Sequence, residues 1–357
     1  ARRAVAVRQP TAPTRREREE HELTHLPFRD WCDDCVCGRG KERDHRRRER
    51  LSDEPRLPEV VMDFGQMGHT SGDRENADFV VMKCCETGHI MAHAIPSKSV
   101  TDSWIAEQLQ RDIDSLGYKK IVWKSDQEAA IVALKAAVRR MCSTEIVMEE
   151  SPKEQSKSSG IAERCIQEVA GMVRVMRRAL ERKIRDEIDV QHPIAPWIIE
   201  HAAETLTRCL VGRDGRTAYE RWKGKKASTP LASFGEKVLY HKAVRHSGRQ
   251  GKWEDRWSEG IWLGASNTSG EARISTNDGI QYARTVRRRM ETERYSGATV
   301  RGMRGSPWQP KPAGEQSAVP EARPISGERI VTQPSPERRV KLKTLWGSQC
   351  LWSGEIT

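Results

Sequence analysis

The sequence predicts a mixed α/β domain followed by a smaller all-β module. From residue 59 to about residue 190, β-rich runs bounded by turn residues are interleaved with runs of helical periodicity. Past residue 237 the helical pattern gives way to short strands separated by glycine turns. A hydrophobic content of 36% in 357 residues is low, but it suffices for at least one core. We therefore expect more than one domain.

The α/β region is predicted to run in the order strand, strand, strand, helix, strand, helix, strand, helix. The first three strands form an antiparallel meander through the Glu86-Thr87-Gly88 turn, while the later strands alternate with helices and should run parallel. This order is the one expected of a ribonuclease-H-like fold, a mixed five-stranded sheet with flanking helices. The predicted strands are 60–64, 79–85, 89–95, 121–125 and 145–148, and the predicted helices are 100–116, 127–141 and 160–184.

Six segments are expected along the chain. Trp253, Trp257 and Trp262 supply bulk for the core of a small β-barrel-like module. Seven of the 17 prolines fall between Pro307 and Pro336, which is typical of a disordered segment. The segments are a disordered start (1–20), a short His/Cys segment (21–45), the α/β core (57–190), a helical extension (191–230), a small basic β-module (233–292) and a disordered tail (293–357).

The net charge of +11 is concentrated after residue 190, whereas residues 58–190 are slightly acidic. Clustered Lys and Arg gain free energy by displacing counterions from phosphates, so a polyanionic partner is one interpretation and a solvated basic surface is the other. Nine cysteines without a secretory signal favour a reduced, intracellular protein. No apolar run is long enough to cross a bilayer, so we expect no membrane partner.

Three carboxylates are the candidate catalytic residues. Asp63 and Asp126 each follow an apolar strand, and Glu163 lies near the beginning of the long helix, at the edge of its packed face. Hard oxygen ligands of this kind hold two Mg²⁺ ions and suit in-line phosphoryl transfer. The alternative for an aspartate at a strand end is a turn or a helix cap.

Basic residues near Glu163 are the candidate DNA contacts. Arg174, Arg177 and Arg178 continue along one line of the helix. The arginine triplets at 46–48 and 287–289 are either phosphate contacts or nuclear-import signals, although such triplets are common on solvated surfaces. The candidate DNA-binding residues are Lys153, Lys157, Arg164, Arg174, Arg177 and Arg178.

Residues 60–184 resemble the catalytic core of retrovirus and retrotransposon integrases, which carry Asp, then Asp, then Glu about 35 residues later. Here 36 residues separate Asp126 from Glu163. Two stretches resemble copia-type elements in particular: Gly160-Ile161-Ala162-Glu163-Arg164 and the segment 217–226, which reads TAYERWKGKK. Two departures are Gln127-Glu128 after the second aspartate, where the family has Asn-Gly, and Ser159 in place of Asn.

Integrases of this family also carry an N-terminal zinc module with two histidines and a Cys-x-x-Cys pair. His21, His25, Cys32 and Cys35 provide those ligand types, but only six residues separate His25 from Cys32, so the segment is a shortened form. Cys37 and His45 are alternative ligands. The competing interpretation is two surface histidines beside free thiols, with Phe28 and Trp31 packed on the core.

The resemblance implies an enzyme that uses Mg²⁺ or Mn²⁺ to trim element ends and to join them to target DNA. It also implies duplex DNA as partner, self-association and a nuclear location. Two alternatives remain open: a catalytically degenerate integrase-like DNA-binding protein and a ribonuclease-H-like nuclease. The start at Ala1-Arg2-Arg3 leads us to expect a fragment or a processed product.

Overall fold

The computed structural model describes residues 10–40, 57–68, 77–96, 103–150, 156–242, 253, 255–266 and 269–312. The first sheet is formed by β1 (Glu59–Met67), β2 (Ala77–Cys84), β3 (Ile90–Ile95), β4 (Lys120–Ser125) and β5 (Glu145–Glu150). Its order is β3-β2-β1-β4-β5; β1, β2 and β3 pair antiparallel, whereas β1, β4 and β5 pair parallel. The predicted ribonuclease-H-like fold is therefore confirmed.

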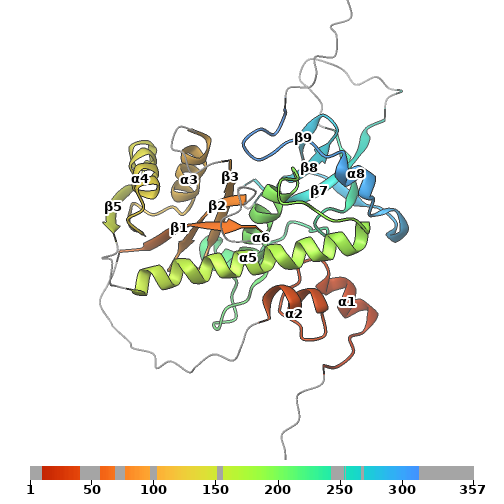
Figure 1. Cartoon of the computed structure of the whole chain (residues 1–357), viewed down its shortest axis with the longest axis horizontal. Helices are drawn as coiled ribbons and strands as arrows, with labels where there is room; N and C mark the ends of the chain where they lie inside the picture. Colours follow the sequence, from red (N-terminus) through yellow and green to blue (C-terminus); the bar gives the residue numbers. More distant parts are fainter. Residues whose placement is uncertain are drawn as a thin grey trace, which may run out of the picture. The chain divides into compact units, whose positions relative to one another are not determined.

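Helices cover both faces of this sheet (Figure 1). On one face, α3 (Ser103–Ser115) and α4 (Ala129–Met141) bury the side chains of Met62, Val80 and Trp123. On the other face, α5 (Ser156–Ile184) and α6 (Ala195–Cys209) share a second apolar cluster with β2 and β3. The Thr207 hydroxyl accepts a hydrogen bond from Ile90 N at 3.0 Å and donates one to Ile90 O at 3.0 Å, which fixes α6 to β3.

A second sheet follows short helix α7 (Ala218–Lys223). Its five antiparallel strands run in the order β10-β6-β7-β8-β9. Trp262 is buried in its core, Trp257 is half-buried and Trp253 is fully exposed, so the prediction that all three tryptophans fill the core is wrong for Trp253. The strands are β6 (Lys237–His241), β7 (Trp257–Ala265), β8 (Ala272–Thr276), β9 (Gly279–Ala283) and β10 (Val286–Arg288).

Order extends further than predicted at both ends. Helix α1 (Arg15–His21) lies partly inside the segment expected to be disordered, because Thr14 and Glu17 form a capping box at its start. Near the other end, the 3₁₀ turn η1 (Glu291–Glu293) is followed by α8 (Gly297–Arg301), whose Val300 joins the α5 and α6 cluster. Trp197 Nε1 also donates to Gly305 O at 2.9 Å. Tertiary contacts of this kind are invisible in local composition.

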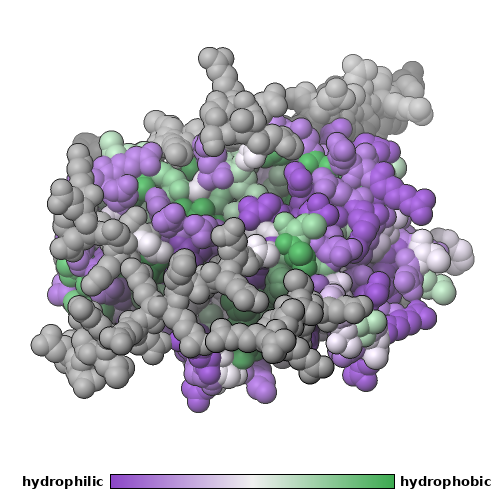
Figure 2. Space-filling view, turned by 60° about the horizontal axis from the view of Figure 1, so that its bottom comes forward, coloured by the Kyte–Doolittle hydropathy of each residue, from purple (hydrophilic) through white to green (hydrophobic). Residues whose placement is uncertain are grey.

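The surface in Figure 2 is mainly hydrophilic among the described residues, with hydrophobic side chains gathered in small areas between them. None of the helices in the described part of the chain combines the length and the apolar character needed to span a membrane.

A buried ionic network joins the two sheets through α6. His93 Nε2 lies 2.7 Å from Asp112 Oδ2 and its Nδ1 lies 3.4 Å from Glu200 Oε1. Arg273 of β8 approaches Glu200 at 3.5 Å and also pairs with Glu204. Burial lowers the pKa of His93, but the Asp112 carboxylate, followed by Glu200, outweighs burial and raises that pKa to about 10.

Replacing His93 by Gln should lower the free energy of unfolding by about 3 kcal/mol near pH 6, because the half-buried Asp112 loses its cation and the buried Glu200 loses one of two. Since the folded pKa of His93 is raised to about 10, its charge stabilises fully below the ordinary pKa of about 6.5 and ceases to do so as the pH rises through 10. Urea unfolding of both proteins should show the difference shrinking between about pH 6 and pH 10. A difference that stays constant would contradict the charged state of His93.

Candidate active site and metal cluster

Four potential metal ligands gather near the start of the chain. The ligand atoms of His21, His25, Cys32 and Cys35 all lie within 4.8 Å of one another, and all four residues are buried. Cys35 Sγ lies 3.3 Å from His21 Nε2 and 3.8 Å from His25 Nδ1, and Cys32 Sγ lies 3.6 Å from His25 Nδ1. A tetrahedral zinc ion would separate neighbouring nitrogen and sulfur ligands by about 3.6 Å. The four residues therefore fit a zinc ion.

Local structure explains how a shortened segment can still assemble this cluster. His21 ends α1, and His25 lies one turn later with a left-handed backbone (φ 54°), which reverses the chain direction. Cys32 is the N-cap of α2 (Asp33–Arg39), so Cys35 lies in its first turn, on the same side. Cys37 is exposed, whereas the four ligands are buried. His45 lies outside the described residues.

The two thiols have opposite pKa shifts. The hydrogen bond from the Cys35 thiol is the largest influence on Cys32 and lowers its pKa, with further lowering by the two histidines. The same hydrogen bond raises the pKa of Cys35, assisted by burial. The thiolate is thus favoured at Cys32, whereas Cys35 would lose its proton to a bound divalent cation.

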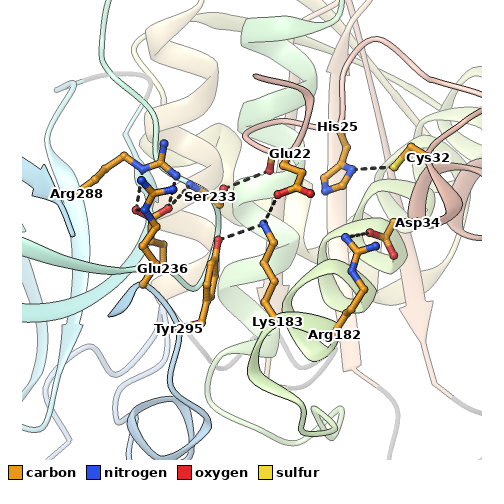
Figure 3. A network of polar contacts seen from close by, with 11 residues as sticks. Glu22, His25, Cys32, Asp34, Arg182, Lys183, Ser233, Glu236, Arg288 and Tyr295 are labelled. Atoms are coloured by element: carbon orange, nitrogen blue, oxygen red, sulfur yellow. Dashed lines mark hydrogen bonds and ion pairs between the residues drawn. The ribbon is translucent and has the colours of Figure 1, made fainter. Parts of the chain in front are cut away.

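The His/Cys segment is fastened to α5 by polar contacts (Figure 3). Arg182 lies 2.9 Å from Asp34 Oδ2, and Lys183 Nζ lies 3.1 Å from Glu22 Oε2. Further along the helix, Gly38 packs so closely that an added Cβ would lie 2.5 Å from Val175 Cγ2. Only glycine fits at this crossing.

The same contacts continue into the second sheet (Figure 3). Lys183 Nζ also donates to Tyr295 Oη at 3.2 Å, and the Ser233 hydroxyl donates to Glu22 O at 3.3 Å. Ser233 N in turn donates to Glu236, a fully buried carboxylate. Glu22 directly follows His21, a member of the His/Cys cluster. The cluster, α5 and the second sheet are therefore joined through one glutamate.

Two of the three candidate catalytic carboxylates are brought side by side by strand register. In the parallel pair β1 and β4, Met62 lies opposite Ser125. Asp63 and Asp126 are the next residues after Met62 and Ser125, so they occupy equivalent positions along the two strands. Adjacent strands lie about 4.8 Å apart. Asp126, which directly follows β4, is therefore expected next to Asp63.

Both aspartates belong to the sheet face covered by α5. Met62 and Trp123 point into the core under α3 and α4, so the alternation along each strand directs Asp63 and Asp126 to the opposite face. Asp63 is half-buried and Asp126 is exposed. Glu163 belongs to α5, which packs on this face, but its side chain is exposed rather than at the packed edge that we expected.

The described structure does not gather the three carboxylates around one point. Among the described His, Cys, Asp and Glu residues, the cluster at His21 is the group of three or more whose ligand atoms lie within 4.8 Å of one another. Like charges repel one another, which favours the separation of the carboxylates.

Two lysines around the aspartates were missed by sequence analysis. Lys135 of α4 is buried, and its Nζ donates to Ser125 Oγ at 2.9 Å and to Trp123 O at 3.0 Å, which fixes the end of β4 beside Asp126. Lys124 lies 2.9 Å from Glu59 and 3.5 Å from Glu149. A lysine within the apolar run of β4 was a weak indication that Lys124 has a partner. Lys135 did not differ in sequence from an ordinary surface lysine of a helix.

The predicted DNA contacts divide into engaged and exposed side chains. Arg174 Nε donates to Gly38 O at 3.2 Å, and Arg177 Nε lies 3.6 Å from Glu181. Arg164 and Arg178 are exposed on α5. Lys153 and the side chain of Lys157 lie outside the described part of the structure.

The arginine triplet at 287–289 is partly engaged in ion pairs. Residues 46–48 lie outside the described residues. Arg288 pairs with Glu236 at 2.7 Å, and Arg289 pairs with Glu293 at 2.6 Å. These two arginines therefore hold the second sheet together, which leaves Arg287 on the surface over the Trp257 ring.

No family model and no curated protein matches the sequence. Among solved structures, a chain of the simian T-cell lymphotropic virus intasome in complex with PP2A regulatory subunit B56 gamma is 14% identical, with a TM-score of 0.32 over 66% of this chain and 84% of that one. The catalytic core domain of BIV integrase is 15% identical, with a TM-score of 0.33 over 46% of this chain and 93% of that one. The ribonuclease-H-like fold is assigned from the strand order of the first sheet, and the candidate site from its geometry, not from these two similarities.

Proposed function

We propose that this chain is an integrase-type polynucleotidyl transferase that acts on duplex DNA. The observation that supports the proposal most directly is the register of β1 and β4, in which Met62 lies opposite Ser125, the residues directly before Asp63 and Asp126. Acidic side chains of this order on a ribonuclease-H-like sheet suit phosphoryl transfer with divalent cations.

Asp63 and Asp126 would hold two Mg²⁺ or Mn²⁺ ions, and Glu163 would reach them from α5. Such ions, when bound, stabilise the attacking and leaving oxygens of an in-line displacement. Lys124 pairs with Glu59 and, at a longer distance, with Glu149, which weakens their competition for the cations. Lys135 holds the end of β4 and with it the position of Asp126.

In the proposed reactions, end trimming hydrolyses one phosphodiester of the element DNA, and joining exchanges a phosphodiester of the target for a new one. During end trimming, water attacks the phosphorus, the bond to the 3′ oxygen breaks, and a free 3′ hydroxyl results. During joining, that hydroxyl attacks a phosphodiester of the target, and the displaced 3′ oxygen takes up the proton. Arg164 and Arg178 are exposed on α5 and would bind the backbone phosphates, together with Lys153 and Lys157.

The second candidate is an integrase-like protein that binds DNA without cutting it. It is favoured by the exposed Glu163 and by the Gln127-Glu128 pair after Asp126. A plain ribonuclease H needs neither the His/Cys segment nor the second sheet. Kinship to copia-type elements, self-association and nuclear location belong to the first proposal and rest on the resemblance of the motifs.

Joining activity gives the test of catalysis. Duplex oligonucleotides that carry the element's ends should be trimmed and joined to target DNA by the wild type with Mg²⁺ or Mn²⁺. Asp63→Asn and Glu163→Gln should each reduce the rate by at least about 100-fold, because a charge that stabilises the transition state is lost. Glu107→Gln, a neutralised exposed carboxylate on the opposite face of the sheet, is the matched control and should retain the wild-type rate.

Full activity in Glu163→Gln would sink the assignment of the trio. A wild type that binds the duplexes but neither trims nor joins them would establish the second candidate.

Zinc at the His/Cys cluster is proposed as a structural ion. The purified wild type should carry one zinc ion per chain by elemental analysis. Cys35→Ser should lose the zinc and unfold at a lower temperature, since metal binding energy contributes directly to folding. Cys37→Ser removes an exposed thiol two residues away and should keep the ion. Equal zinc content in the Cys35 and Cys37 variants would refute this ligand set.

A further inference from the structure

The segment 211–228 contains six basic and two acidic residues, and the proposed catalytic site uses none of them. Five of the basic residues are exposed, Arg213 among them, and the other four are Arg216, Lys223, Lys225 and Lys226. We call these four residues the α7 surface.

Both acidic residues of the segment are already engaged. Asp214 receives two hydrogen bonds from Arg221, at 2.9 and 2.5 Å. Glu220 accepts from Thr217 N at 2.7 Å, as the second half of the capping box of α7. The α7 surface therefore keeps its positive charge.

The four cations lie close together along the chain. Lys223 ends α7, Lys225 and Lys226 follow it within three residues, and Arg216 directly precedes the N-cap Thr217. In agreement, Lys226 and Arg216 contribute to the lowered pKa of Glu220 after the larger effect of the Thr217 backbone, and Lys225 contributes to the lowered pKa of Lys223 after burial. Like charges held near each other gain most from a partner that carries a row of negative charges.

Helix α7 is held firmly on the first domain. Arg221 donates to Thr87 O at 2.9 Å, in the turn between β2 and β3. Trp222 Nε1 donates to Ser115 O at 2.9 Å at the end of α3, and its ring packs 4.1 Å from that of His89. Lys223 Nζ in turn lies 3.6 Å from the centre of the Trp222 ring. The surface is built before any ligand arrives, so binding costs little ordering.

We propose that the α7 surface binds the phosphate backbone of duplex DNA, outside the site of the carboxylates. Lysine side chains at an exposed turn match phosphates as point charges and read no base edges, so the contact is independent of sequence. The turn at Thr87 lies at the beginning of β1, where Val60 pairs with Cys84, whereas Asp63 lies further along that strand. Contact here adds affinity without touching the reacting phosphodiester. The choice of DNA rests on the proposed function.

The test measures binding without catalysis. Fluorescence anisotropy of a labelled 30-base-pair duplex is recorded in buffer without Mg²⁺ or Mn²⁺, over a series of salt concentrations. Neutralising two phosphate contacts should reduce the slope of log K against log salt by about 1.8, so Lys225→Gln/Lys226→Gln should show this reduction and weaker binding. Arg139→Gln/Arg140→Gln removes two equally exposed charges at the end of α4 and should leave the slope unchanged.

An unchanged slope in the lysine variant, an equal reduction in the arginine control, or no duplex binding by the wild type would each overturn the proposal. Tighter binding to single-stranded RNA than to the duplex, lost in the lysine variant, would overturn the choice of DNA. If the wild type fails to join DNA but the lysine variant shows the reduced slope, the proposed enzyme fails and the α7 surface stands. If the wild type joins DNA but the lysine variant keeps the wild-type slope, the proposed enzyme stands and the α7 surface fails.

Discussion

The parallel pairing of β1 with β4 is the constraint on which the proposed chemistry depends. Each strand has its core-facing residues under α3 and α4, so a shift of one residue would move an aspartate to the wrong face. The observed register sets Met62 opposite Ser125 and thereby makes Asp63 and Asp126 neighbours. Lys135 of α4 stabilises the end of β4 through hydrogen bonds to Trp123 O and Ser125 Oγ.

Helix α5 connects that site with the rest of the molecule. Its apolar stripe packs on the first sheet, its middle carries the Gly38 crossing, and its end holds Glu22 through Lys183. The His/Cys segment contacts α5 and the second sheet through Glu22, so a structural change at the His/Cys cluster would affect both. In physical terms, zinc would act here as a brace for α5 rather than as a participant in catalysis.

Much of the fold could be predicted because strand and helix periodicities are local properties. The five strands of the first sheet, the helices between them and the grouping of His21, His25, Cys32 and Cys35 follow from patterns within a few residues of each other. The use of Arg288 could not be predicted, because its partner Glu236 is 52 residues away. Order in α8 likewise depends on burial of Val300 against a distant cluster.

The candidate site shows the same division. Residue type and strand position indicated Asp63 and Asp126, and the register pairs the residues directly before them, Met62 and Ser125. The exposed state of Glu163 did not follow from the sequence, since the rotation of a long helix on a sheet is set by packing along its whole length. The TAYERWKGKK stretch was noticed as a family motif, but its contacts with Thr87 and Ser115 emerge only in the structure.

The proposed function requires Asp63 and Asp126 to hold divalent cations that attract the Glu163 carboxylate. Anomalous diffraction from crystals of the protein soaked in Mn²⁺ tests this directly. Two peaks about 3.5–4 Å apart are expected between the two aspartates, with the Glu163 carboxylate in contact with at least one of the ions. Crystals that bind Mn²⁺ elsewhere, with no peak between Asp63 and Asp126, would contradict it.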